Sequence, residues 1–168
     1  MGHDYGKAMT SFWDTTGKAL NGNTDALALA LYFISNRHAN GIGLYYIPLQ
    51  YIVFDLGLTE KRAWEAIMAL HKAGWLCYDR ENGVVWVQKM AYNEVSDPNN
   101  EKRQKWVQAE FDRQPKSVLS GHWLNEYRDH FDLYPHGLSY CSHIDADGKI
   151  QGYRDPDNED DEDEDDED

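Results

Sequence analysis

Cationic and polar side chains between residues 59 and 89 have the chemistry needed to contact a polyanion. Lysine and arginine neutralise phosphate groups, and the planar fork of Arg62 matches the two acceptors on the major-groove edge of a guanine. A hydroxyl such as that of Thr59 can donate to a phosphate oxygen. The set comprises Thr59, Lys61, Arg62, Glu65, Lys72, Arg80, Asn82 and Lys89.

A second cationic set lies further along the chain and includes aromatic residues. Unpaired bases can stack on aromatic rings while lysine and arginine follow the phosphates, so this set is a candidate single-strand platform. The same composition also describes a solvated helix face whose aromatic residues belong to the core, and both interpretations are open. The set comprises Lys102, Arg103, Lys105, Trp106, Phe111, Arg113 and Lys116.

Metal and catalytic chemistry have little support in the sequence. His136, Cys141, His143 and Asp145 carry zinc-ligand atoms, but their spacing matches no zinc-finger pattern. Residues 145–148 resemble the opening of a calcium loop without its later ligands, which favours a turn. Because no phosphate-binding glycine loop and no nucleophile motif is present, we predict no enzyme, no cofactor and no metal.

Hydrophobic periodicity predicts the elements that position the first set. Asn23 or Thr24 can cap a helix with apolar side chains nearly all round, which is typical of a buried central helix. A short β-favouring run ends at Pro48, and helical spacing then resumes twice. The predicted elements are a helix at 24–35, a strand at 43–47, a helix at 48–56 and a helix at 60–73.

A β-hairpin is predicted directly after the third helix. Residues 75–78 and 84–87 are rich in aromatic and β-branched residues, and Asn82-Gly83 between them is a strong turn signal. Three helices, a short strand before the second helix and a final hairpin have the order of a winged helix-turn-helix domain. Its third helix would carry Lys61 and Arg62, and its wing would carry Arg80.

Two more helices and an acidic run follow this domain. Helical spacing at 101–114 and 117–131, interrupted by Pro115, predicts a helical hairpin that packs on the first domain or on a second copy of the chain. Residues 140–153 are compatible with a small hairpin around Asp147-Gly148. The predicted domains are a winged-helix domain at 1–95, a linker and helical hairpin at 96–131, an irregular segment at 132–154 and a polyacidic tail at 155–168.

The net charge of -14 belongs to this tail. Asp155, Asp157 and the run 159–168 hold twelve of the 30 acidic residues, which leaves 18 acidic against 16 basic residues in the rest of the chain. Adjacent carboxylates repel one another and offer no apolar side chain to bury, so the tail is predicted to be disordered. The 13% aromatic content of the chain excludes disorder for most of the remainder. The expected fold is therefore mainly α, of the α+β class.

No apolar run approaches the length of a membrane span, and the first residues do not resemble a secretory signal. We therefore expect a cytoplasmic protein that does not contact membranes. Cys77 and Cys141 are the two cysteines of the chain, and reduced thiols are the expected state in that compartment.

Taken together, residues 11–14, 36–45, 72–75 and 84–87 resemble the N-terminal winged-helix domain of bacteriophage replication-initiation and replisome-organiser-like proteins. The likeness covers residues 1–95 and continues more weakly into 101–131, where 110–117 looks like the helix-proline-helix segment that follows that domain. The resemblance implies a role at phage origins or in primosome loading. It also implies that the third helix and the wing contact DNA.

We expect DNA binding through the third helix and the wing, with double-stranded or single-stranded DNA as the partner. Two alternatives are open: a protein-docking or host-factor inhibitor protein without DNA contact, and a winged-helix transcriptional repressor that binds as a homodimer. The first is favoured by the charge of residues 1–95, which hold 8 basic and 9 acidic residues. The acidic tail could solubilise the chain, dock onto host or phage replication proteins, or compete with DNA phosphates.

Overall fold

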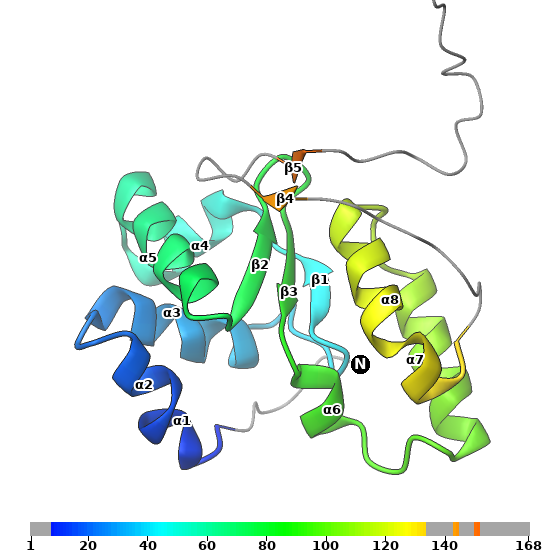
Figure 1. Ribbon diagram of the computed structural model, residues 1–168. Helices are drawn as coiled ribbons and strands as arrows, with labels where there is room; N and C mark the ends of the chain where they lie inside the picture. Colours follow the sequence, from blue (N-terminus) through cyan, green and yellow to red (C-terminus); the bar gives the residue numbers. More distant parts are fainter. Residues whose placement is uncertain (1–7, 134–142, 145–149, 152–168) are drawn as a thin grey trace, which may run out of the picture.

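The centre of the protein is an antiparallel sheet of three short strands, β1 (Leu44–Tyr46), β2 (Leu76–Asp79) and β3 (Val84–Val87) (Figure 1). The computed structural model describes residues 8–133, 143–144 and 150–151. The last of the three strands in the sequence is the central one, so that the spatial order is β1-β3-β2. Helices and strands are mixed in one chain, which confirms the predicted α+β class.

Five longer helices surround the sheet, and each lies where the sequence predicts one. Four of them begin after a residue whose side chain accepts a backbone N–H, namely Asn23, Thr59, Asn100 and Ser117. The remaining one follows Pro48. The helices are α3 (Thr24–Ser35), α4 (Leu49–Leu56), α5 (Glu60–Lys72), α7 (Glu101–Asp112) and α8 (Val118–Phe131).

Three short helices have no counterpart in the sequence prediction. They are α1 (Ser11–Asp14), α2 (Thr16–Ala19) and α6 (Met90–Glu94). Four or five residues cannot display a helical period, so hydrophobic spacing gives no signal for them. α6 nevertheless contributes Met90 and Ala91 to the core.

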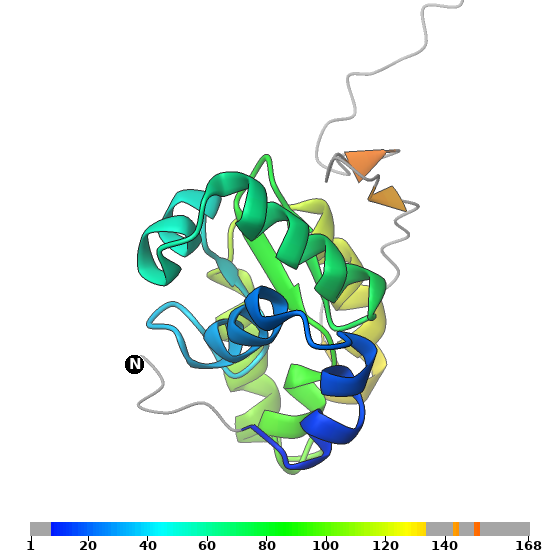
Figure 2. The same ribbon diagram turned by 90° about the vertical axis from the view of Figure 1, so that its left-hand side faces the viewer.

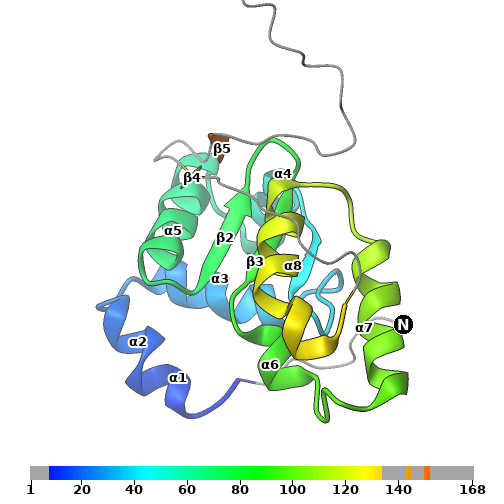
Figure 3. The same ribbon diagram turned by 45° about the vertical axis from the view of Figure 1, so that its right-hand side comes forward.

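Helices cover both faces of the sheet. Successive strand residues point to opposite faces, so Tyr45 and Val85 pack with α3 and α5, while Leu44 and Val84 pack with α8. Figures 1 and 3 show α3 and α5 on one side of the sheet and the α7–α8 hairpin on the other. In Figure 2 the same α5 lies in front and α8, in yellow, lies behind. The sequence predicts that the α7–α8 hairpin packs either on the first domain or on a second copy of the chain. In the structure it packs on the sheet of its own chain.

Beyond α8 the structure describes two further short strands. β4 (His143–Ile144) and β5 (Ile150–Gln151) pair antiparallel within the segment where a small hairpin is predicted. No helix within residues 8–133 is long and apolar enough to cross a membrane. Several predictions fall outside the described residues: the Asp147-Gly148 turn, the acidic tail at 155–168, and the candidate ligands His136, Cys141 and Asp145.

Gly43, just before β1, is expected to tolerate no side chain. Its φ is 70°, and an added Cβ would lie 2.7 Å from Cβ of Met90 and 2.8 Å from the Val87 carbonyl oxygen. We expect Gly43→Ala to lower the free energy of unfolding by about 2 to 3 kcal/mol, measured by urea denaturation. Gly57→Ala is the matched control, because Gly57 has a φ of 62° with nothing within 4 Å of an added Cβ. Equal losses in the two variants would show that backbone strain alone is responsible.

Candidate nucleic-acid interface

The polar face of α5 and the turn between β2 and β3 form one exposed surface. The opposite face of α5 is held against α3 and the sheet by its buried residues, Ala63, Ala66, Ile67 and Leu70. All eight residues of the first cationic set are exposed. Exposure alone does not bring them together, and their positions divide them into two groups.

Arg62 lies at the start of α5 and forms a two-point ion pair with an acidic partner. Its Nε donates to one carboxylate oxygen of Asp25 at 2.9 Å and its Nη2 to the other at 2.8 Å. This hydrogen bonding holds the pKa of Arg62 above its ordinary value. Asp25 belongs to the first turn of α3. The guanidinium fork that could contact a guanine is therefore occupied by a carboxylate, and a guanine contact requires this ion pair to open.

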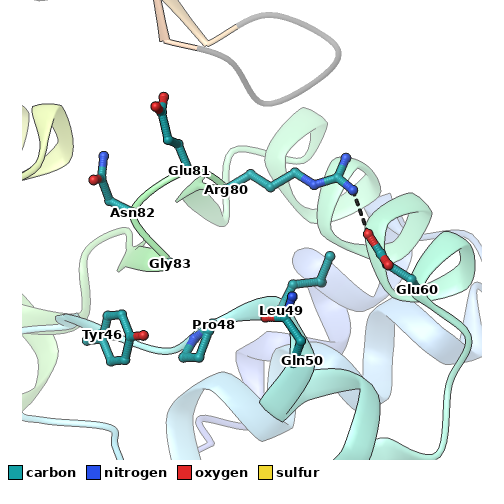
Figure 4. Close-up of a pocket in the computed structure, with 9 residues that line it drawn as sticks. All are labelled: Tyr46, Pro48, Leu49, Gln50, Glu60, Arg80, Glu81, Asn82 and Gly83. Atoms are coloured by element: carbon teal, nitrogen blue, oxygen red, sulfur yellow. Dashed lines mark hydrogen bonds and ion pairs between the residues drawn. The ribbon is translucent and has the colours of Figure 1, made fainter.

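Arg80, at the β2–β3 turn, is held in a similar way. Its Nη2 donates to Oε1 of Glu60 at 2.7 Å, and its guanidinium carbon lies 4.9 Å from the ring centroid of Trp64. Figure 4 shows the Arg80 side chain reaching toward Glu60 beside a cavity of about 280 Å³. The start of α4 forms the other side of this cavity. The lining residues are Tyr46, Pro48, Leu49, Gln50, Glu60, Arg80, Glu81, Asn82 and Gly83.

The other polar residues of this region are also engaged within the chain. Nζ of Lys61 lies 3.8 Å from Oε1 of Glu65, one helical turn away. The Thr59 hydroxyl oxygen accepts the backbone N–H of Arg62 and caps α5. The Asn82 side-chain amide donates to Asp79 at 2.8 Å. Thr59, Lys61 and Arg62 thus lie near Arg80, and each of the three cations has a carboxylate partner within the chain.

Lys72 and Lys89 lie away from this group. Lys72 ends α5, about 16 Å along the helix from Lys61 at a rise of about 1.5 Å per residue. Lys89 follows β3, at the end of the strand opposite to the turn, and lines a separate cavity with Gly74 and Trp75. An antiparallel hairpin places the residue after its second strand far from its turn, so the sequence set does not form one site.

The second cationic set lies on α7 and in the segment that follows it, on the other side of the sheet from α5 (Figures 1 and 3). Its lysine and arginine residues are exposed, and two form local ion pairs: Lys105 with Glu101 at 2.5 Å and Arg113 with Glu110 at 3.3 Å. The hydrogen bond from Lys105 lowers the pKa of Glu101. The two cationic sets therefore cannot act as one continuous surface.

The two aromatic residues of α7 differ in their exposure to solvent. Trp106 is 39% exposed. Phe111 stacks on the buried Trp123 with 5.1 Å between the ring centroids, so its ring packs against the core. Of the two interpretations left open for Phe111, the structure supports core packing, because its ring packs between α7 and α8.

Sequence reasoning missed an aromatic surface on α4. Phe54 is 85% exposed and Tyr51 is 47% exposed, and Tyr46 at the end of β1 is 48% exposed. The signal was available, because neither Tyr51 nor Phe54 belongs to the apolar stripe of Leu49, Ile52, Val53 and Leu56 that predicts this helix. The Tyr51 ring lies 5.4 Å from the ring of His38, and Tyr46 lines the same cavity as Glu60 and Arg80.

Metal ligands are not gathered in the part of the chain that the structure describes, where no group of three or more His, Cys, Asp or Glu residues could hold an ion. The candidate interface therefore consists of cationic and aromatic side chains on one side of the sheet.

No protein-family model, no curated protein and no solved structure matches this chain.

Proposed function

We propose that the protein is a winged-helix DNA-binding protein that acts in phage replication in the host cytoplasm. The element order and the sheet order β1-β3-β2 support the winged-helix assignment, with α3, α4 and α5 as its three helices and the β2–β3 turn as its wing. The resemblance of residues 1–95 to phage replication-initiation proteins supports the replication role.

One observation carries the DNA-binding proposal. α5 buries one apolar face and leaves its polar face exposed beside the wing, so that Lys61, Arg62 and Arg80 lie at one end of a helix. A major groove is wide enough to admit one helix. When such a helix lies in the groove, lysine and arginine at its start can contact DNA phosphates, while the wing contacts the adjacent DNA backbone.

The acidic residues at 155–168 are proposed to modulate this binding. Their negative charge can occupy the same cations that contact phosphates, so that DNA and tail compete. Charge alone supports this part of the proposal, since these residues lie outside those that the structure describes. A chain that ends at Arg154 should bind DNA more tightly than the full chain if the tail competes.

Reversing the charges of Lys61 and Arg62 tests the main proposal. We expect the double variant Lys61→Glu, Arg62→Glu to weaken DNA binding about 10- to 100-fold, because two phosphate or base contacts are lost. The measurement is fluorescence anisotropy with labelled duplex and single-stranded DNA at about 50 and about 200 mM salt. The matched comparison is Lys102→Glu, Arg103→Glu on α7, which makes the same charge change on the other side of the sheet. A greater loss in the α7 variant would assign DNA binding to α7 instead.

A protein-docking function is the second candidate, and the exposed rings of Tyr51 and Phe54 favour it. Large exposed apolar side chains beside a charge-balanced surface are typical of protein contacts. Under this alternative the chain forms a complex that survives nuclease treatment, and Phe54→Ser weakens that complex. Neither the full chain nor its Lys61 and Arg62 variant would then bind DNA at low salt.

A further inference from the structure

Each arginine near the start of α5 is paired with a carboxylate that comes from another part of the fold. Arg62 on α5 meets Asp25 on α3 through two hydrogen bonds, and Arg80 on the wing meets Glu60 on α5 at 2.7 Å. The surface proposed to bind DNA therefore carries two arginines and two carboxylates. Its cationic character is cancelled at the place where DNA contacts are expected.

These ion pairs are accessible to solvent and to a competing anion. The side chain of Arg62 is 55% exposed and that of Arg80 is 41% exposed. Exposed ion pairs add little net stability, since water and salt screen them. A phosphate presents oxygen atoms to a guanidinium fork in the same way as a carboxylate, so it can take the carboxylate's place.

The fold does not need these pairs to hold its helices together. α3 and α5 pack through buried apolar residues of the first core cluster, among them Leu29, Phe33, Ala63 and Ile67. Asp25 and Glu60 instead lie at the edge of that contact, in the first turns of α3 and α5. Their removal should therefore change the surface charge more than the structure.

We propose that Asp25 and Glu60 set the DNA affinity of this protein, because DNA binds by replacing a carboxylate with a phosphate at Arg62 and at Arg80. The inference rests on the proposed function and specifies how its binding surface is regulated. Two acidic residues that do not touch DNA thus determine how tightly the surface binds and how strongly salt affects it.

The test measures binding of the full chain to a labelled mixed-sequence duplex over a range of salt concentrations. We expect Asp25→Asn and Glu60→Gln each to tighten binding about threefold to tenfold at low salt. Each should also steepen the slope of log K against log salt by up to about 0.9, because no displaced carboxylate remains beside the bound phosphate to offset the charge that the arginine neutralises. The matched control is Asp14→Asn, which removes the carboxylate of the exposed Asp14–Lys18 pair on α1 with the same change in net charge.

A second variant distinguishes a released arginine from a general charge effect. In Glu60→Gln, Arg80→Gln the gain in slope should disappear, since no guanidinium remains to meet a phosphate. The proposal is overturned if Asp25→Asn and Glu60→Gln bind no tighter than the unchanged chain, or gain no more than Asp14→Asn. If no variant binds DNA although circular dichroism shows them folded, both this inference and the proposed function are wrong.

Discussion

Replacing Trp123 with alanine is expected to lower the free energy of unfolding by about 3 to 5 kcal/mol, the range for deleting a large buried ring. The Trp123 side chain is fully buried on α8, between the rings of Phe111 and Tyr127. Its Nε1 donates to the Ile42 carbonyl oxygen at 2.9 Å, which ties α8 to the segment before β1. The substitution leaves a cavity and removes the partner of that carbonyl. Urea denaturation followed by circular dichroism measures the loss.

Trp106→Ala on the neighbouring helix is the matched control for this prediction. It deletes the same ring from a position that is 39% exposed, and we expect it to cost less than about 1 kcal/mol. A loss at Trp123 no greater than that at Trp106 would mean that the α7–α8 hairpin contributes little to the stability of the sheet. The α7–α8 hairpin would then be an accessory to the part of the fold formed by α3, α5 and the sheet rather than part of its core.

The five longer helices could be predicted because their signals are local. Asn23 and Thr59 each accept a backbone N–H three residues ahead, so the residue type and the apolar spacing behind it are enough. The Asn82-Gly83 turn is local in the same sense, since Gly83 adopts a φ of 62°. Bounds agree with the prediction to within about two residues, which is the usual uncertainty at helix ends.

The covering of the sheet's second face could not be predicted, because it depends on distant pairs. Trp123 reaches Ile42 across 81 residues, and nothing in either neighbourhood specifies that contact. The apolar stripe of α8 shows only that this face of the helix must pack against something. A second copy of the chain could cover it as well as the sheet of the same chain. The packing of Leu44 and Val84 against α8 decides between the two.

In the candidate site, too, the local features could be predicted from the sequence and the pairs distant in the sequence could not. The helical period of α5 turns Lys61 and Arg62 outward, and the i, i+4 pair of Lys61 with Glu65 can be read from spacing alone. The pair of Arg62 with Asp25 spans 37 residues and that of Arg80 with Glu60 spans 20, so neither has a local signal. Sequence reasoning therefore identified the cationic residues of the surface without the carboxylates that neutralise them.

Asp79 connects this surface to the second half of the fold. It ends β2 with its carboxylate fully buried, and it accepts hydrogen bonds from three donors. Two come from Asn82, through its backbone N–H at 3.0 Å and its side-chain amide at 2.8 Å. The third is the Ser117 hydroxyl at 2.6 Å, which also accepts the Leu119 backbone N–H at the start of α8. One side chain thus holds the β2–β3 turn and the beginning of α8 in place.

We expect Asp79→Ala to lower the free energy of unfolding by about 3 kcal/mol, because it leaves the buried hydroxyl of Ser117 and two partly buried N–H groups of Asn82 without an acceptor. The substitution also removes the desolvation cost of burying a carboxylate, which opposes this loss. That gain is smaller, since three hydrogen bonds stabilise the charge in the native state. Asp129→Ala, at an exposed position on α8, removes the same charge and should change stability by less than about 0.5 kcal/mol.

A double-mutant cycle isolates the link between the β2–β3 turn and α8. Ser117→Ala alone should cost about 1 kcal/mol, and in the Asp79→Ala background it should cost less, since the shared hydrogen bond is already lost. The measurement is the urea midpoint of the four chains at one salt concentration. Strictly additive losses would mean that Asp79 stabilises only its own turn through Asn82. Coupling between the two would mean that the Asp79–Ser117 hydrogen bond itself stabilises the fold, so that a change in the proposed DNA-binding wing alters how firmly the start of α8 is held.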